Sequence, residues 1–597
     1  MLNKDIFAYV TEQINNYNTS SIPLEDNWDW SMKEHLRRCF LLKNSKFSKG
    51  ANDGSRPNNN IILPILNVAY RTEGFDVKDI GPFVNDKDNY YKSFLVKKYH
   101  PRFARKNDLD TFIDEVVESY ADYGLSFIRD VDEVRPELVK LQSLAFCDQT
   151  DILKGPFAIR HLMTIDELVD QKGKWDSDKV DMAINIAKAE KSVTATGLVA
   201  KTPGKYVEVY EVHGVLETEW LRKEGEELEG TKAYTRQIQI ITYYVGEDNK
   251  RYGLCLYKGK EKSGIFKALV RDPIFGRACG RSAIEELFEP QVWTNYSEIR
   301  LKDMLDNASI SVIKTTDPTF RTKNKTKDLK NNEVLELEPG TDATWMNNSS
   351  AQNFQYFANK ITAWETSART IGSASEPSLG ITPSSGTPLG TSQLVTAQGQ
   401  GMHAYRQGKV ATFFGEIYRD WILKYIVNDM NGGQKFFDEL SPDELQYVVE
   451  NVTNNAINRR IKAMMINGKL PTQEEKDLFK TMVASEFKKS DGKHFMEVVK
   501  DELKNLPIDV EINVTGKQKD LAARADKLSN IFRTIFAKPE VLQIPGMGDL
   551  FNDILESSGF NPISFTSLTK SALPVEKPMV GGGMIPGMPV DKNLVTA

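Results

Sequence analysis

Two long stretches of the chain have the hydrophobic spacing of α-helices, and a segment without periodicity separates them. The first stretch carries apolar residues at every third or fourth position, which predicts one narrow helix seam. The residues of this seam are Phe354, Phe357, Ile361, Trp364, Ala368 and Ile371. The second stretch predicts a helix that runs to Val427. The segment between them, IGSASEPSLGITPSSGTPLGT (371–391), is rich in Gly, Pro and hydroxyl residues. Because long loops within compact domains are usually functional or disordered, this segment is either a functional loop or a disordered surface insertion.

The region before these helices is predicted to be mixed α/β. A helix from Leu109 to Tyr123 is expected to end at Gly124 and to lead into a short strand, LSFIRDV (125–131). Further strands are expected at 156–163, 205–217, 236–245 and 252–258. Their alternation predicts an antiparallel sheet with one solvent-exposed face. Thr164 and Glu167 form a capping-box pattern that begins a helix after the first of these strands.

A long helix is predicted to begin at Ser282, which forms a second capping-box pattern with Glu285. Apolar residues at helical spacing continue this helix to about Asn307. Pro290 is expected to kink it near its start, because proline lacks the backbone N–H and clashes with the preceding turn.

A compact insert follows at about 308–348. Two short strands are predicted in it, ISVIK (310–314) and EVLELEP (333–339), on either side of a basic, turn-like segment. The basic residues of this segment are Arg321, Lys323, Lys325, Lys327 and Lys330. Such a cluster is typical of a surface that contacts DNA or an acidic protein, and equally of an ordinary solvated hairpin.

The helix after the loop carries an aromatic and apolar stripe that predicts core packing rather than a ligand site. This stripe consists of Phe413, Phe414, Ile417, Tyr418, Trp421, Ile422 and Tyr425. Gly399, Gly401 and Gly408 near its start suggest a close helix approach or a bend, or else a frayed helix start, since each glycine weakens a helix. Beyond this helix the chain is predicted to be helical, with one alternating strand, IDVEINV (508–514), and a tail of flexible composition.

Composition limits the classes of function. With 597 residues, 40% of them apolar and 27% charged, the chain is expected to fold into about three or four domains or lobes. A net charge of -6 argues against a protein that grips nucleic acid with its whole surface. Neither an export signal nor a membrane span is visible. The four cysteines form no CxxC pair, so free thiols are expected and a metal site is not.

Motifs of the common enzyme classes are missing. The sequence contains no phosphate-binding loop, no H-E-x-x-H, no nucleophile elbow and no dinucleotide fingerprint. The prediction is therefore a protein that is not an enzyme and holds no cofactor. An intracellular enzyme whose site is built from scattered residues is a less favoured alternative.

The order of these elements resembles the portal protein of tailed double-stranded DNA bacteriophages. Two passages carry the likeness beyond element order: ALVRDPIFGRACGRSAIEELFEPQVWTNYSEIRLKDML (268–305) and SYADYGLSFIRD (119–130). The likeness covers roughly residues 105 to 535. It implies an α+β, mainly helical fold. Its parts would be a wing (1–278), stem helix 1 (279–307), a small α/β clip (308–349), stem helix 2 (350–372), a tunnel loop (373–392), a tunnel helix with the rest of the wing (393–515), a helical crown (516–575) and a flexible tail (576–597).

The resemblance also implies a function and partners. Portal proteins form a ring, usually of twelve copies, at one capsid vertex of the virion, and are assembled in the host cytoplasm. The implied partners are further copies of the chain, double-stranded DNA that passes through the ring, the terminase large subunit, the major capsid and scaffolding proteins, and tail or adaptor proteins. No membrane partner is implied. The tunnel-loop residues implied to face DNA are Ser378, Thr382, Ser384, Ser385, Thr387 and Thr391. The basic clip residues would contact DNA, terminase or an adaptor. Another virion component, such as a tail or baseplate adaptor, is the alternative in the same class.

Overall fold

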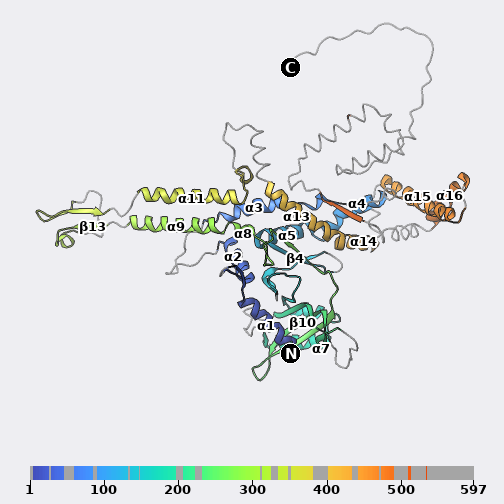
Figure 1. The fold of residues 1–597 in the computed structure, drawn as a ribbon, viewed down its shortest axis with the longest axis horizontal. Coiled ribbons are helices and arrows are strands. Elements are labelled where there is room, and N and C mark those ends of the chain that lie inside the picture. Colours follow the sequence, from blue (N-terminus) through green and yellow to red (C-terminus); the bar gives the residue numbers. More distant parts are fainter. Residues whose placement is uncertain are drawn as a thin grey trace, which may run out of the picture. The chain divides into compact units, whose positions relative to one another are not determined.

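The structure is a computed structural model in which the chain forms two compact units. The first unit comprises Met1–Phe436 with Met496–Lys519, and the second comprises Phe437–Phe495 with Asp520–Ala597. The fold is mixed α+β and mostly helical, with a curled antiparallel sheet (Figure 1). The residues that the structure describes are 5–25, 28–45, 59–84, 90–131, 135–146, 148–195, 206–221, 232–309, 312–324, 334–346, 351–380, 401–432, 442–468, 472–489, 508–512 and 533.

The largest sheet of the first unit is antiparallel, as predicted, and its strands lie in the order β11-β10-β9-β7-β6. Its members are β6 (Leu144–Phe146), β7 (Phe157–Met163), β9 (Val207–Glu217), β10 (Tyr234–Val245) and β11 (Arg251–Lys260), with β8 (Ser192–Val193) paired to the end of β10. The predicted capping box is also confirmed, because Thr164 and Glu167 bond reciprocally at the start of α6 (Ile165–Asp170).

The prediction that this sheet has one solvent-exposed face is wrong. On one face, Tyr210 packs with apolar residues of helix α1 (Ile6–Thr19), such as Val10 and Ile14. On the other face, Val207 and Val209 pack against α6 and α7 (Ser177–Lys188). Helices therefore cover both faces, and the polar residue in the alternation, Glu208, is buried where it accepts a hydrogen bond from the Tyr210 hydroxyl at 2.7 Å.

A smaller sheet connects this region to the rest of the first unit. It has the order β12-β4-β5 and consists of β12 (Phe266–Val270), β4 (Leu125–Arg129) and β5 (Glu137–Leu138). Helix α5 (Leu109–Tyr123) precedes β4 with the predicted bounds. Gly124 ends α5 in the left-handed conformation, with φ of 74°, and turns the chain directly into β4.

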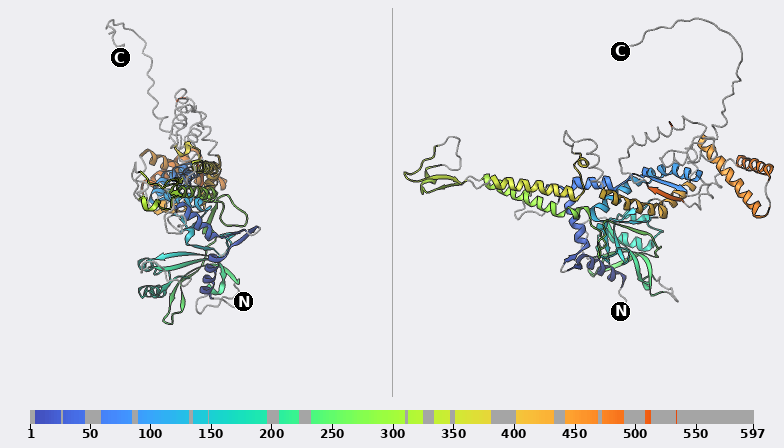
Figure 2. Two further views of the ribbon diagram at one scale, coloured as in Figure 1. Left: turned by 90° about the vertical axis from the view of Figure 1, so that its left-hand side faces the viewer. Right: turned by 45° about the horizontal axis from the view of Figure 1, so that its top comes forward.

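Two long helices of the first unit lie side by side, as Figure 1 and the right-hand view of Figure 2 show. They are α9 (Phe288–Ser309) and α11 (Ala351–Ile371). The first differs from its prediction, because a separate turn, α8 (Ala283–Glu286), precedes α9 and the break falls at Leu287. Pro290 accounts for this break, since its ring excludes the carbonyl four residues earlier from a regular helix.

The compact insert between α9 and α11 contains β13 (Val312–Thr315), α10 (Phe320–Lys323) and β14 (Ala343–Met346). Strand β13 is confirmed, but its partner is not the predicted 333–339 segment. In that segment the Asn324 side chain bonds both the N–H and the C=O of Glu336, at 2.9 and 2.8 Å. The Glu338 N–H bonds Asp317 Oδ2 at 2.9 Å. These side chains satisfy backbone groups that a strand would have paired, so the segment stays extended without joining the sheet.

The helix after the loop begins with α13 (Gly401–Ile417), passes through one π-helical turn (Tyr418–Ile422) and continues as α14 (Leu423–Gly432). All seven residues of the aromatic and apolar stripe are buried, which confirms them as core. A Cβ at Gly401 or Gly408 would meet open space, so these glycines make no close helix approach among the described residues.

The remaining elements of the first unit are α2 (Met32–Lys43), α3 (Ile62–Glu73), α4 (Tyr90–Lys106) and the two-stranded pairs β1 (Ile22–Glu25) with β2 (Trp28–Trp30) and β3 (Ile80–Val84) with β15 (Ile508–Ile512). Strand β15 confirms the alternating strand predicted near residue 508. Described helices of the second unit are α15 (Pro442–Ile466) and α16 (Gln473–Lys489).

Candidate functional site

A buried charge network joins α3, α8 and α13 within the first unit. Glu73, the last residue of α3, is fully buried, and its Oε1 atom accepts hydrogen bonds from Arg271 at 3.3 Å and from His403 at 3.0 Å. Burial opposes ionisation of Glu73, but the bond from His403 and the charges of Arg271 and Arg406 outweigh it and lower the pKa of the carboxyl. Glu73 is therefore held as a buried anion by cations from two other segments.

Arg406 of α13 extends the same network. Its guanidinium bonds Asp272 at 2.6 Å and Glu286, the last residue of α8, at 3.0 Å. Arg271 reaches the other oxygen of Glu286 at 3.4 Å. No sequence pattern predicts this network, because its members are scattered along the chain and none stands in a recognisable motif. Its consequence is a fixed joint between the base of the long helices and the start of α13.

Backbone contact strengthens this joint. The Gly124 carbonyl accepts hydrogen bonds from the N–H groups of Arg271 and Gly280 at 3.0 and 3.1 Å. A Cβ at Gly124 would lie 2.8 Å from the carbonyl carbon of Gly280, and a Cβ at Gly280 would overlap the Arg271 carbonyl. The predicted capping box at Ser282 forms only in part. The Ser282 hydroxyl accepts from the Glu285 N–H at 2.9 Å, while the Glu285 carboxylate binds Arg277 at 2.7 Å.

The pair α9–α11 leaves large apolar side chains exposed. Trp293 and Trp364 stack across the pair, with ring centroids 6.3 Å apart and an interplanar angle of 11°. The large side chains of this pair that are more than half exposed are Trp293, Tyr296, Leu305 and Tyr356. Of the predicted seam, only Ala368 is buried, and Ile371 is exposed. Two helices alone therefore do not bury the apolar surface that the sequence places on them.

The predicted functional loop begins with residues packed against α3. Ala374 is buried, and Leu379 packs against the same apolar cluster as Ile65 of α3. Ser378 is half-buried; its hydroxyl lies 2.7 Å from that of Ser375, and its carbonyl accepts from Arg71 at 3.4 Å. The other predicted loop residues, Thr382, Ser384, Ser385, Thr387 and Thr391, lie outside the described residues.

Two of the five predicted basic residues of the insert are described. Arg321 and Lys323 both lie on α10, and Lys323 Nζ is 3.3 Å from Glu338 Oε1. Asp317 anchors this turn by accepting bonds from the Thr319 N–H and hydroxyl at 2.7 and 2.8 Å. The Asp-Pro pair at 317–318 is a turn signal that could have located this anchor. Lys325, Lys327 and Lys330 lie outside the described part of the chain.

A second buried cluster of ionisable groups lies where the two sheets meet. His213 Nδ1 is 2.9 Å from Glu261 Oε1, and its Nε2 is 3.0 Å from Glu211 Oε1. Glu211 also lies 2.7 Å from Arg129 of the smaller sheet. Burial disfavours the charged imidazole, but the two carboxylates outweigh it and raise the pKa of His213. The cluster therefore links the sheets through charges whose strength depends on pH.

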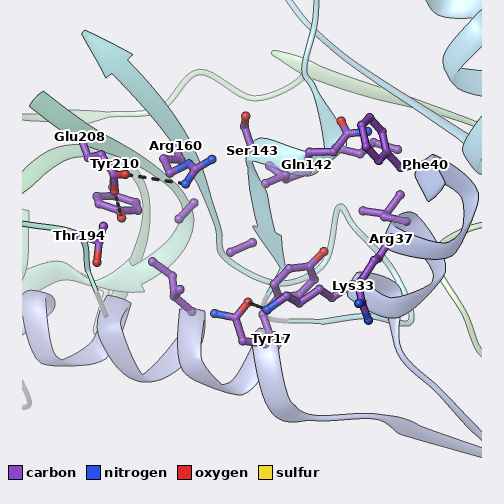
Figure 3. Close-up of a pocket in the computed structure, with 17 residues that line it drawn as sticks. Tyr17, Lys33, Arg37, Phe40, Gln142, Ser143, Arg160, Thr194, Glu208 and Tyr210 are labelled. Carbon is purple, nitrogen blue, oxygen red and sulfur yellow. Dashed lines mark hydrogen bonds and ion pairs between the residues drawn. The ribbon is translucent and has the colours of Figure 1, made fainter. Parts of the chain in front are cut away.

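A cavity of about 510 Å³ lies between α1, α2 and the large sheet (Figure 3). Its apolar lining includes Ile14 and Tyr17 of α1, Leu36 of α2, Leu144 of β6 and Ala158 of β7. This volume falls in the range of binding pockets. No sequence pattern predicts this cavity, because its lining residues come from segments up to about 200 residues apart, from Ile14 to Tyr210.

Among the described residues, no group of three His, Cys, Asp or Glu side chains is placed to hold a metal ion. The described cysteines, Cys39, Cys255 and Cys279, are free thiols, while Cys147 lies outside the described residues. Of the helices that the structure describes, none has both the length and the apolar character needed to cross a bilayer.

The sequence matches no protein-family model, and no curated protein is significantly similar to it.

Proposed function

We propose that this chain is the portal protein of a tailed double-stranded DNA bacteriophage. In this proposal, copies of the chain form a homo-oligomeric ring at one capsid vertex. The ring is the channel for genome packaging and ejection, and the docking site for terminase and for tail or adaptor proteins. The protein performs no catalysis itself.

The observation that carries the proposal is the pair α9–α11, which ends in a small insert and leaves its aromatic side chains exposed. Exposed apolar patches of this kind mark interaction surfaces, because burying them yields about 25 cal/mol per Å². A pair that lines up with its copies around an axis would bury Trp293 and Tyr296 against the neighbouring pair. This arrangement would complete the packing that one chain leaves open.

The order of elements supports the same proposal. A mixed α/β region leads into α9, the insert, α11, the loop and then α13, which is the order of wing, stem, clip, stem, tunnel loop and tunnel helix in portal proteins. The joint around Glu73 would then hold the stem and the tunnel helix of each subunit together. The small hydroxyl residues of the loop suit contact with moving DNA, since few ionic contacts mean little salt-sensitive affinity.

The test is electron microscopy of the purified full-length protein, combined with sedimentation. Closed rings with a hole wide enough for duplex DNA are expected. The variant Tyr296→Glu should reduce ring formation, because the charge enters the proposed interface. The matched control is Tyr234→Glu on β10, since both tyrosines are exposed to a similar extent, 52% and 58%. The control should leave the rings intact. A protein that stays monomeric, or rings that tolerate both variants equally, would refute the proposed stem interface.

A ring without a DNA-wide hole would favour a tail or baseplate adaptor instead. Stimulation of a terminase ATPase by the purified ring would identify the motor as the partner.

A further inference from the structure

The cavity beside α2 has a rim that carries positive charge. Lys33 and Arg37 line it from α2, and Arg160 lines it from β7 (Figure 3). Glu208 is the one carboxylate among its described lining residues, and it lies 3.8 Å from Arg160. The chain as a whole has a net charge of -6, so this cationic rim is a local feature.

The positive charges of the rim are only partly neutralised. Lys33 Nζ donates to the neutral amide of Asn18 at 2.7 Å. Arg37 lies 3.4 Å from Glu34, but Arg38 shares the same carboxylate at 3.1 Å. Two guanidinium groups thus divide one counter-charge. The rim therefore retains a positive potential that attracts carboxylates.

The shape of the site favours an extended ligand. Lys33, Arg37 and Phe40 recur on one face of α2, and the seven residue steps from Lys33 to Phe40 correspond to about 10 Å of helix. Phe40 lines the cavity and is 49% exposed, so the apolar surface continues from the interior of the cavity to the solvent. The cationic side chains Lys33 and Arg37 therefore border an elongated apolar groove, formed by the cavity and the exposed face of Phe40. A small anion would contact only part of this groove.

We propose that this groove binds an acidic peptide segment of a partner protein. An apolar side chain of the segment would enter the cavity between Leu36 and Leu144. Its carboxylates would face Lys33, Arg37 and Arg160. This proposal does not depend on the ring, because the groove is complete within one chain.

The experiment is a titration of full-length protein into a fluorescein-labelled peptide, EDELFDELED, followed by fluorescence anisotropy at low and at physiological salt. Saturable binding that weakens with salt is expected. A peptide with lysine in place of every acidic residue, and one with serine in place of its Leu and Phe residues, should each bind at least about tenfold more weakly.

Two variants of α2 form a matched pair. Arg37→Glu should weaken binding about tenfold, because it reverses a charge on the rim. Arg38→Glu should weaken binding by no more than about twofold, because Arg38 does not line the cavity and acts on the rim only through the Glu34 carboxylate. Both residues contact Glu34, both are mostly exposed (68% and 62%), and only Arg37 lines the cavity. Ser143→Trp, which fills the cavity without changing its charge, should abolish binding at an unchanged melting temperature.

Several results would overturn the proposal. Absence of saturable binding, equal affinity for the lysine peptide, or equal loss in the two arginine variants would each do so. Tight binding of decanoate without binding of the peptide would assign the groove to an amphipathic small molecule. A change in oligomeric state on Arg37→Glu alone would assign it to a neighbouring copy of the chain.

Discussion

Gly124→Ala tests whether close backbone contact fixes the joint at the base of the long helices. Alanine in the left-handed conformation of residue 124 costs about 1–2 kcal/mol. The added Cβ would lie 2.8 Å from the carbonyl carbon of Gly280, well inside ordinary contact distance. Overpacking of this kind costs about 1–3 kcal/mol. A shift that relieves it weakens the two hydrogen bonds that the Gly124 carbonyl accepts, each worth about 0.5–1.5 kcal/mol. Because such a shift exchanges the overpacking for weaker hydrogen bonds, only one of these two costs adds to the conformational cost, and the total expected loss is about 2–5 kcal/mol.

Gly173→Ala is the matched control for this substitution. Gly173 also has a positive φ, 92°, but a Cβ there would meet nothing within 4 Å. It should therefore lose only the conformational cost of about 1–2 kcal/mol. The effect of glycine on the unfolded chain is common to both variants and cancels in the comparison.

The assay is the urea midpoint of the full-length protein, together with hydrogen–deuterium exchange of residues 109–129. Exchange reports local opening, which matters because a chain of two units need not unfold in one step. Gly124→Ala should lower the protection of 109–129 strongly, whereas Gly173→Ala should leave it unchanged there. If both variants lose the same stability, the close approach between α5 and the turn before α8 contributes nothing and the reasoning is refuted.

Three further perturbations have defined outcomes. The pKa of folded His213 is raised above its ordinary 6.5, so the stability that the protonated imidazole contributes should be complete below pH 6.5 and lost as the pH rises through the raised pKa. Urea midpoints measured against pH should fall over this range. The variant His213→Asn should remove this pH dependence. Glu73→Gln should cost about 3–5 kcal/mol in thermal unfolding by leaving buried cations uncompensated, whereas the exposed control Glu376→Gln should change stability by less than about 0.5 kcal/mol. Charge reversal at Lys323 and Lys325 should weaken DNA packaging in a reconstituted assay while electron microscopy still shows rings; unaltered packaging would remove the proposed role of these residues.

Local signals predicted most of the described secondary structure of the first unit. Helix α5 has its predicted ends because Leu109 begins an apolar face and Gly124 supplies the left-handed residue that stops it. The sheet strands β7, β9, β10 and β11 follow from alternation, and Thr164 caps α6 as its pattern indicates. In each case the determining contacts lie within a few residues of sequence.

Errors occurred where a distant group decided the outcome. The 333–339 segment has strand-like composition, but the side chains of Asn324 and Asp317 bond the backbone groups that a neighbouring strand would otherwise pair with. The alternation of β9 predicts an exposed face, but α1, almost 200 residues earlier in the chain, covers that face. No periodicity within the strand contains this information.

Among the described residues, the buried charge network of the candidate site also depends on contacts between segments that are far apart in the sequence. A charge such as Glu73 is readable in sequence only as a polar residue at a helix end, where solvent exposure is the usual expectation. Its burial becomes favourable only because Arg271 and Arg406 arrive from segments that are about 200 and 330 residues away along the chain. A buried anion held by two distant cations ties three segments to one geometry, since moving any of them leaves an uncompensated charge. In the proposed portal, such a joint would hold the long helices and α13 of each subunit in fixed relation to one another.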